Sequence, residues 1–500
     1  MAMNGDGRSE EDMEGDAKKK RTSTKFEVLM CGYLPGVVSQ KPPLVSPVAV
    51  ASPESGIDGD SWKDVCGGGC GFAIAIAESG KLITWGSADD QGQSYLTSGK
   101  HGETPEPFQL PTETPIVKAS AGWAHCVSLT EKSEVYTWGW KECVPSAKIT
   151  RLTLEGGAEG DTSGKQSSAL FEQALTVAES PRSQGSKSAG VSVLHLDNKK
   201  TGEETPKRRK VSPFKQEIES PPPADESLSA PPCLVALDPG IKITSVAAGG
   251  RHTLALSDVG QVWGWGYGGE GQLGLGSRIK IVASPHLIPC IEPATCGKER
   301  TSGITSGEVY SGTPAPNVLG SYIKGIACGG RHSAVITDGG ALLTFGWGMY
   351  GQCGQGNTND VLRPTCVPSL LSTRVEDVAA GLWHTLCICA DGRVHAFGGN
   401  QFGQLGLGTG TDQSEMTPRL VDATILESKN AKRISCGARH STVMTEDAKV
   451  YSWGWNKYGQ LGLGDTIDRN IPAQVPLEDY TPKNIACGWW HTLLLAETLR

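Results

Sequence analysis

Six histidines recur along the chain with similar neighbours, and they are the first residues to examine for chemistry. Imidazole binds transition metals and transfers protons near neutral pH, so a converging set would indicate a metal centre or an acid–base site. These six stand 51 residues or more apart, and no cysteine or carboxylate recurs beside them. We therefore predict a structural role, a hydrogen bond within each histidine's own repeat, and no metal or cofactor. The six are His125, His252, His332, His384, His440 and His491.

The cysteines are the second candidates, since the chain has 15 of them. Zinc sites need two cysteine or histidine pairs at ligand spacing, and the near-pairs Cys66/Cys70 and Cys387/Cys389 have no second pair. Three further cysteines occupy one repeat position that holds alanine in other copies, which predicts a small buried residue and a reducing compartment. These are Cys328, Cys436 and Cys487, against Ala121, Ala248 and Ala380.

Glycine-rich runs and nucleophile motifs give no sign of catalysis. The run Gly264–Gly269 lies between predicted strands and lacks the Gly-Lys-Ser/Thr ending of a phosphate-binding loop. No Gly-x-Ser-x-Gly motif places a serine on a strand-to-helix turn. We predict that the protein is not an enzyme, has no catalytic residue and takes no small-molecule substrate directly.

The histidines belong to a long internal repeat. A clear copy, VAAGGRHTLALSDVGQVWGWGYGGEGQLGLG, occupies 246–276 and returns at 326–356, 378–408 and 434–464. Weaker copies lie at 65–86, where Phe72 replaces the histidine, and at 117–140, and a half-copy runs from 485 to 497. Four of the six gaps between successive motif positions are 51–56 residues, and the other two contain insertions. The chain therefore has seven units.

Each unit predicts short antiparallel strands. His-Thr-Leu-Ala-Leu alternates, a turn follows, Val-Trp-x-Trp-Gly alternates again, and Gly-Gln-Leu-Gly-Leu-Gly forms a further turn. Four-stranded units repeated around an axis bury a continuous core and leave few open sheet edges. The sequence therefore predicts an all-β fold, a seven-bladed β-propeller.

The seventh unit lacks its Val-x-x-Trp-Gly strand before Arg500. Phe26–Tyr33 (FEVLMCGY) has the missing pattern, with Val28 and Gly32 in the places of Val450 and Gly454. We expect this N-terminal strand to complete the last blade and close the ring.

The RHT…GxVWxWGxGxxGQLGxG unit resembles the repeat of the regulator of chromosome condensation family, over residues 26–146 and 232–497. The resemblance implies a protein-binding propeller that associates with chromatin through histones and regulates gene expression. It equally implies an alternative, guanine-nucleotide exchange on a Ran-type small GTPase. The wedge that serves exchange in that family matches no position of this chain.

The ultraviolet-B photoreceptor of plants, which shares this fold, carries tryptophan in Gly-Trp-Arg-His-Thr motifs on consecutive blades. Here the corresponding residues are Gly250, Gly330, Leu382 and Ala438, with tryptophan only at Trp123 and Trp489. We therefore predict that this chain is not a light sensor.

Composition divides the chain into four segments. We predict a disordered N-terminus at 1–25, propeller at 26–146, a disordered insertion at 147–231, and the remaining blades at 232–500. The insertion is rich in Ser, Gly, Pro, Glu and Lys and has no tryptophan, and a shorter polar stretch at 292–318 is predicted to be a loop.

The insertion contains the basic sequence Thr-Pro-Lys-Arg-Arg-Lys-Val-Ser-Pro (205–213). A compact basic cluster flanked by prolines is typical of an importin-binding nuclear localisation signal. We predict nuclear localisation through Lys207, Arg208, Arg209 and Lys210, with a second cluster at Lys18, Lys19, Lys20 and Arg21. Thr205, Ser212 and Ser220 precede prolines and are candidate phosphorylation sites near the first cluster.

The charge balance indicates which class of partner the protein binds. The formal net charge is −8, and the segments 1–25 and 147–231 each carry as many acidic as basic side chains. The negative charge therefore belongs to the predicted propeller, which favours a basic protein such as histone over naked DNA. No apolar run is long enough to span a membrane.

The tryptophans of the repeat are predicted to divide into two groups. We expect Trp85, Trp138, Trp265 and Trp453 to pack between blades. We expect the flanking Trp140, Trp263, Trp347 and Trp455 to be partly exposed and available as interface anchors.

Overall fold

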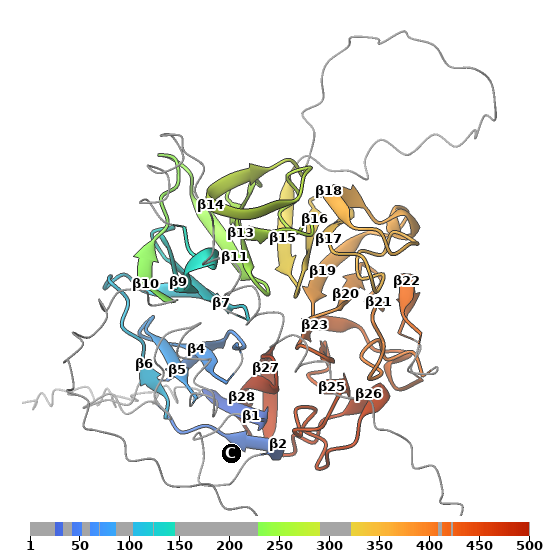
Figure 1. Ribbon diagram of the computed structural model, residues 1–500. Helices are drawn as coiled ribbons and strands as arrows, with labels where there is room; N and C mark the ends of the chain where they lie inside the picture. The colour runs from blue at the N-terminus through green and yellow to red at the C-terminus, as the bar shows by residue number, and fades with distance from the viewer. Residues whose placement is uncertain are drawn as a thin grey trace, which may run out of the picture. The chain divides into compact units, whose positions relative to one another are not determined.

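The computed structural model describes residues 26–33, 43–52, 61–69, 71–86, 104–123, 125–145, 229–290, 322–408, 413–421 and 424–499. These residues form seven four-stranded antiparallel sheets arranged around a common centre (Figure 1). The predicted all-β, seven-bladed propeller is therefore confirmed. The only helices in this part of the chain are short 3₁₀ turns at Lys141–Cys143, Pro368–Leu370 and Thr424–Leu426.

The blades are numbered here along the chain. Blade 1 consists of β3 (Trp62–Val65), β4 (Ala73–Ala77), β5 (Leu82–Trp85) and β6 (Glu106–Pro107). Blade 2 consists of β7 (Ile116–Ala121), β8 (His125–Thr130), β9 (Val135–Trp140) and β10 (Ser229–Leu234). Blade 3 consists of β11 (Ile243–Ala248), β12 (His252–Ser257), β13 (Val262–Gly268) and β14 (Ile279–Ile288). Blade 4 consists of β15 (Ile323–Cys328), β16 (His332–Thr337), β17 (Leu342–Gly346) and β18 (Val361–Cys366).

Blade 5 consists of β19 (Val375–Ala380), β20 (His384–Cys389), β21 (Val394–Gly398) and β22 (Glu415–Leu420). Blade 6 consists of β23 (Ala431–Cys436), β24 (His440–Thr445), β25 (Val450–Gly454) and β26 (Arg469–Gln474). Blade 7 consists of β27 (Tyr480–Cys487), β28 (His491–Thr498), β1 (Phe26–Gly32) and β2 (Leu44–Ala49).

The last blade joins the two ends of the described chain. Strand β1 pairs with β28 along its whole length, from Phe26 opposite Glu497 to Gly32 opposite His491. The blue strands of Figure 1 therefore lie beside the red ones in one sheet. The predicted closing strand is confirmed, and β2 adds a second N-terminal strand, outside β1, that the sequence pattern did not reveal.

Burial follows from the stacking of blades. The first strand of each blade lies nearest the axis, and successive first strands contact one another from blade 2 round to blade 7 and on to blade 1. The second strand has blades on both sides, so every residue of β8, β12, β16, β20 and β24 is buried. A strand covered on both faces needs apolar or small residues throughout, which explains sequences such as HSAVIT in β16.

Glycines mark the places where neighbouring backbones meet near the axis. A Cβ on Gly249 or Gly381 would approach the carbonyl oxygen of the corresponding glycine in the next blade within 2.5 Å or 2.7 Å. Gly250 N–H donates to the Gly329 carbonyl and Gly330 N–H to the Gly381 carbonyl, at 3.0 Å in both cases. Hence these positions exclude side chains because the blades are linked through their backbones.

Loops divide between two faces of the ring. The loops from first to second strand and from third to fourth strand leave the same end of each blade, because the strands are antiparallel. The hairpin turns from second to third strand lie on the opposite face. Strand β10 begins at Ser229, slightly before the predicted boundary at 232, and the chain from 146 to 228 connects it to β9. None of the helices that the structure describes is long and apolar enough to cross a membrane.

Candidate functional site

The six motif histidines are buried, with no exposed surface, at the start of the second strand of blades 2 to 7. Five of them hydrogen-bond a hydroxyl of the next blade. For example, His332 Nε2 lies 2.8 Å from Thr385 Oγ1, and His440 Nε2 lies 3.0 Å from Thr492 Oγ1. The expected hydrogen bond within the same blade is wrong, because the partner hydroxyl lies on the next blade. The imidazole is long enough to cross the interface, so it joins blades.

The hydroxyl group that is hydrogen-bonded to Nε2 determines which ring nitrogen of the histidine carries the proton. Ser333, Thr385, Ser441 and Thr492 donate to backbone carbonyls of Gln272, Gln352, Gln404 and Gln460, at 2.7–2.9 Å. Their single proton is thereby used, so Nε2–H of each neighbouring histidine must be the donor. Burial lowers the pKa of the first five histidines to about 3 and of His491 to about 4, so all six are neutral at physiological pH.

This chain of polar contacts is interrupted at blade 1. Phe72 occupies the histidine position, and Ala73 occupies the hydroxyl position that would face His491. Blade 1 is instead joined to blade 7 by apolar packing, for example of Trp85 against Val28 and Met30, and by the Asn484 side chain, which donates to Asp64 Oδ1 at 2.6 Å.

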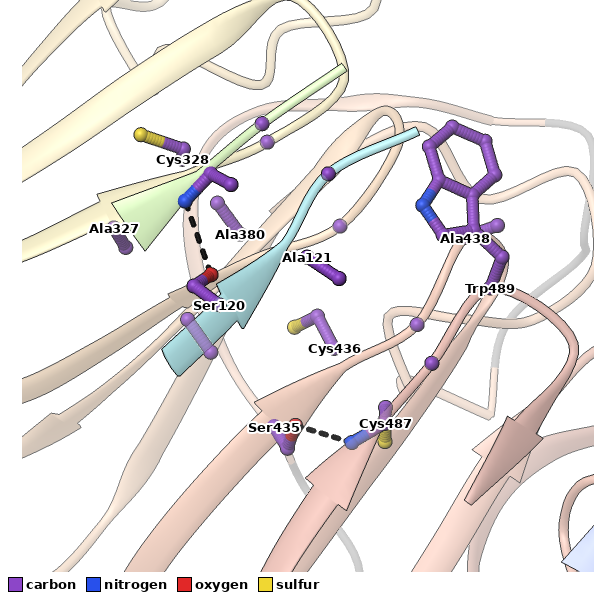
Figure 2. A pocket seen from close by; sticks show the side chains of 18 of the residues that line it. Ser120, Ala121, Ala327, Cys328, Ala380, Ser435, Cys436, Ala438, Cys487 and Trp489 are labelled. Atoms are coloured by element: carbon purple, nitrogen blue, oxygen red, sulfur yellow. Dashed lines mark hydrogen bonds between the residues drawn. The ribbon is translucent and has the colours of Figure 1, made fainter. Parts of the chain in front are cut away.

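The axis of the propeller contains a cavity of about 220 Å³. Small residues from the ends of the first strands line it, together with Trp489 (Figure 2). Hydrogen bonds from Ala248 N–H to Ser120 Oγ (3.0 Å) and from Cys487 N–H to Ser435 Oγ (2.8 Å) join adjacent blades around it. No Asp, Glu, Lys, Arg or His side chain is among the described residues that line it.

Cys328, Cys436 and Cys487 lie on this cavity wall and are half-buried, not fully buried as predicted. The cause is their position on the innermost strand, where one side faces the open axis. Cys328 Sγ donates to the Ala247 carbonyl of the previous blade at 3.4 Å. Burial raises the pKa of all three thiols, which is unfavourable for nucleophilic reactivity. Within the described residues, no three His, Cys, Asp or Glu side chains are grouped to hold a metal ion.

One face of the propeller, the acidic-turn face, carries a carboxylate in every described hairpin turn between second and third strands. The turns belong to blades 1 to 6, and most of their carboxylates are exposed. Four of the same turns also contain an exposed basic side chain, namely Lys81, Lys132, Arg393 and Lys449. Asp447 pairs with Lys429 at 2.7 Å and Asp391 lies 3.7 Å from Arg393, so part of the negative charge is compensated locally. The residues that define this face are Glu78, Glu131, Glu134, Asp258, Asp338, Asp391, Glu446 and Asp447.

The opposite face, the arginine–tryptophan face, carries arginines stacked on aromatic rings. Arg439 is only 1% exposed, and its guanidinium lies 5.3 Å from the Trp383 ring centroid, 4.8 Å from Phe402 and 5.4 Å from Trp455. A planar cation packs well between aromatic faces. Arg439 thus joins the loops of blades 5 and 6.

Two more arginines repeat this arrangement. Arg251 lies over Trp140 and Tyr267, at 5.2 Å and 4.6 Å from the ring centroids, and forms an ion pair with Glu142. Burial first, and then the charge of Arg331, lowers the pKa of Arg251 to about 10, so it remains cationic at neutral pH. Arg331 lies 5.0 Å from the Trp347 ring and 3.4 Å from a Glu270 oxygen.

The tryptophan predictions are partly confirmed. Trp85, Trp138, Trp265 and Trp453 are at most 1% exposed, and Trp85, for example, packs between blades 7 and 1. Trp263 and Trp347 are half-buried, as expected. The prediction of partial exposure is wrong for Trp140 and Trp455, which are only 5% and 7% exposed because Arg251 and Arg439 cover their rings. The Arg-His pair that recurs at 251–252, 331–332 and 439–440 is the sequence signal for these stacks.

Several predicted residues lie outside the described part of the chain. They are Lys18, Lys19, Lys20, Arg21, Thr205, Lys207, Arg208, Arg209, Lys210, Ser212 and Ser220. The segments 1–25 and 292–318, and the insertion up to residue 228, lie there too.

The model of the RCC1-like domain matches residues 197–499, which is more than half of the chain. The chain belongs to the RCC1-like domain family. This RCC1-like protein is 29% identical over 421 residues to the ultraviolet-B receptor UVR8 of Arabidopsis thaliana, covering 81% of this chain and 79% of the receptor. It is 33% identical over 276 residues to the E3 ubiquitin-protein ligase HERC2 of Homo sapiens, covering 54% of this chain but only 5% of the ligase.

Solved structures agree on the fold. Human WBSCR16 superposes with a TM-score of 0.62 at 19% identity, covering 95% of this chain and all of that one. Prp20p of Saccharomyces cerevisiae, described with its binding to Gsp1p and histones, superposes with a TM-score of 0.61 at 17% identity, covering 95% and 92%. A second Prp20 structure, which is bound to Kap60, superposes with a TM-score of 0.61 at 17% identity. The match covers 100% of this chain and 97% of that one. At these identities the likeness establishes the RCC1-type propeller fold alone.

Proposed function

We propose that this RCC1-like protein is a nuclear, chromatin-associated adaptor that binds histones through the acidic-turn face and contributes to the regulation of gene expression. The observation that carries the proposal is the recurrence of a carboxylate in each described hairpin turn of that face. A basic protein meets complementary charge there over several blades at once. The net charge of −8 supports the same partner, and Prp20p, with the same fold, is described as a histone binder.

Nuclear entry is assigned in this proposal to the basic cluster Lys207–Lys210, with Lys18–Arg21 as the second signal. The importin would bind the cluster as an extended chain, within the segment 147–231 that the proposal treats as a flexible insertion. Phosphorylation at Thr205, Ser212 or Ser220 would add negative charge beside the cluster and weaken that binding. Alanine at all four residues 207–210 should reduce nuclear accumulation, and unchanged localisation would assign import to Lys18–Arg21 or to a partner.

Guanine-nucleotide exchange on a Ran-type GTPase is the second candidate. One observation favours it, namely that Prp20p is also described with Gsp1p. The two candidates separate in one experiment, affinity capture of the tagged full chain from nuclear extract at near-physiological salt, with protein identification. Core histones as the dominant, salt-sensitive partners support the adaptor. A small GTPase retained after nucleotide removal, without histones, supports exchange.

A further inference from the structure

Four aromatic rings gather on the arginine–tryptophan face where blades 6 and 7 meet. This four-ring cluster consists of Tyr33, Trp455, Tyr458 and Trp490, which come from the chain after β1, the β25–β26 loop and the loop before β28. The rings of Trp455, Tyr458 and Trp490 meet edge to face at 67–73°, with centroids 5.1–6.3 Å apart. Tyr33 lies 5.1 Å from Tyr458.

The cluster is accessible to a partner. Tyr33 is 38% exposed, and Tyr458 and Trp490 are half-buried, while Trp455 forms the floor at 7%. Its assembly depends on ring closure, since Tyr33 N–H donates to the Trp490 carbonyl at 2.9 Å directly after β1. Closure of the propeller therefore also builds this part of the surface.

Cations of the protein itself already contact these rings. On the buried side, the Arg439 guanidinium lies 5.4 Å from the Trp455 centroid. On the solvent side, the ammonium of exposed Lys457 lies 5.7 Å from the Tyr458 centroid. An exposed contact of this kind is weak, and a better-matched cation can displace it.

Negative charge lies beside the rings as well. Asp468 Oδ1 accepts a hydrogen bond of 2.7 Å from the backbone N–H of Asn456, the residue between Trp455 and Lys457. Asp465 lies on the same loop, accepts from the Asn456 side chain at 3.2 Å and pairs with Arg469 at 2.6 Å, so its charge is compensated locally. Aromatic faces favour a cation of low hydration, and the Asp468 carboxylate adds negative charge on the same loop.

We propose that the four-ring cluster is a docking site for a methylated lysine side chain of a basic protein tail. A quaternary ammonium loses little hydration on contact with aromatic faces, whereas a free ammonium loses hydrogen bonds that rings do not replace. This proposal rests on the proposed function, since it names the feature of a histone tail that the arginine–tryptophan face would read.

The test uses the full chain labelled with 5-fluorotryptophan, with the Trp455 and Trp490 signals assigned by substitution. The probe is acetyl-glycyl-trimethyllysyl-glycine amide, compared with the unmethylated peptide and with its uncharged tert-butyl isostere. We expect the Trp490 signal to shift on titration with the trimethylated peptide, with affinity at least about fivefold higher than for the isostere. Equal affinity for the isostere would overturn the proposal, because apolar contact alone would then explain binding.

Two variants separate binding from folding. Lys457→Ala removes the competing ammonium and should raise the affinity about two- to fivefold, whereas Trp490→Leu should abolish the peptide-induced shift of the remaining Trp455 signal. Trp347→Leu, a half-buried aromatic stacked on Arg331, is the matched control and should bind normally. Unchanged or weaker binding by folded Lys457→Ala would contradict the proposal.

A parallel measurement with unmodified recombinant core histones distinguishes this inference from the proposed function. Histone binding without methyl-lysine preference refutes the four-ring site alone. Methyl-lysine binding without histone binding refutes the adaptor role and leaves the site.

Discussion

At the scale of the residue, the motif histidine joins neighbouring blades. His384 Nε2 of blade 5 donates to Ser441 Oγ of blade 6 at 3.0 Å, and Ser441 donates back to the Gln404 carbonyl of blade 5 at 2.7 Å. Each such residue thereby connects two sheets that share no backbone ladder. The repeat thus selects histidine because it reaches across the interface and is a neutral donor there.

Replacing this donor should destabilise the propeller. We expect His384→Leu to lower the free energy of unfolding by about 1–3 kcal/mol, since the buried Ser441 oxygen loses the N–H that donates to it. His384→Gln, which also offers an N–H donor, should lose less. Urea denaturation followed by tryptophan fluorescence measures the difference, with His286→Ala, at an exposed position, as the control. A leucine variant as stable as the wild type would contradict the assigned role.

At the scale of the element, ring closure depends on β1. Leu29 is 1% exposed and packs with Met444 and Val450 of blade 6, while its strand pairs with β28 from the other end of the described chain. The strand pattern Val28…Gly32 predicted this element because it repeats Val450…Gly454. Strand β2 was not predicted because LVSPVA contains proline and lies outside the repeat motif.

A smaller side chain in β1 should weaken closure. We expect Leu29→Ala to lower the free energy of unfolding by about 2–5 kcal/mol through lost burial and the cavity left behind. Val259→Ala, at a residue 66% exposed in a hairpin turn, is the matched control and should have little effect. Hydrogen exchange should show the loss of protection in β28 and β27 first. Faster exchange confined to another blade would contradict closure by β1.

The sequence predicted the blades and their buried residues more completely than the contacts between blades and the clusters on the surface. Repeat spacing is a local property, so it gave the blade number and the buried Trp265 and Trp453 correctly. The spacing of residues within one repeat does not show which residues of neighbouring blades contact each other. For that reason the partners of the histidines, the arginine stacks over Trp140 and Trp455, and the four-ring cluster emerged only in three dimensions.

At the scale of the whole molecule, six buried neutral histidines make stability depend on pH. The folded-state pKa values of about 3 to 4 lie below the ordinary value of 6.5, so the unfolded state binds more protons between these limits. The contribution of these histidines to the free energy of unfolding is therefore fully present above about pH 6.5 and is lost as the pH decreases toward 3. Each histidine contributes up to about 1.4 kcal/mol per pH unit.

Thermal unfolding measured between pH 7.5 and 4 checks this dependence. The melting temperature should fall steeply below pH 6.5, and His384→Gln should reduce the slope because one protonatable group is removed. His286→Ala should leave the slope unchanged. A flat profile for the wild type down to pH 4 would contradict the burial of these imidazoles as neutral groups.

The carboxylates repeated in the turns of six blades lead to the proposal that the acidic-turn face binds histones. Its most direct test is the equilibrium affinity of the purified full chain for reconstituted core histones at near-physiological salt. We compare the wild type with Asp258→Asn/Asp391→Asn/Glu446→Gln and with a control of equal charge change on the other face, Ser277→Lys/Thr358→Lys/Gln401→Lys. The account predicts salt-sensitive binding that the first variant weakens at least about tenfold and the control changes much less. Absence of histone binding, or equal losses in both variants, would contradict it.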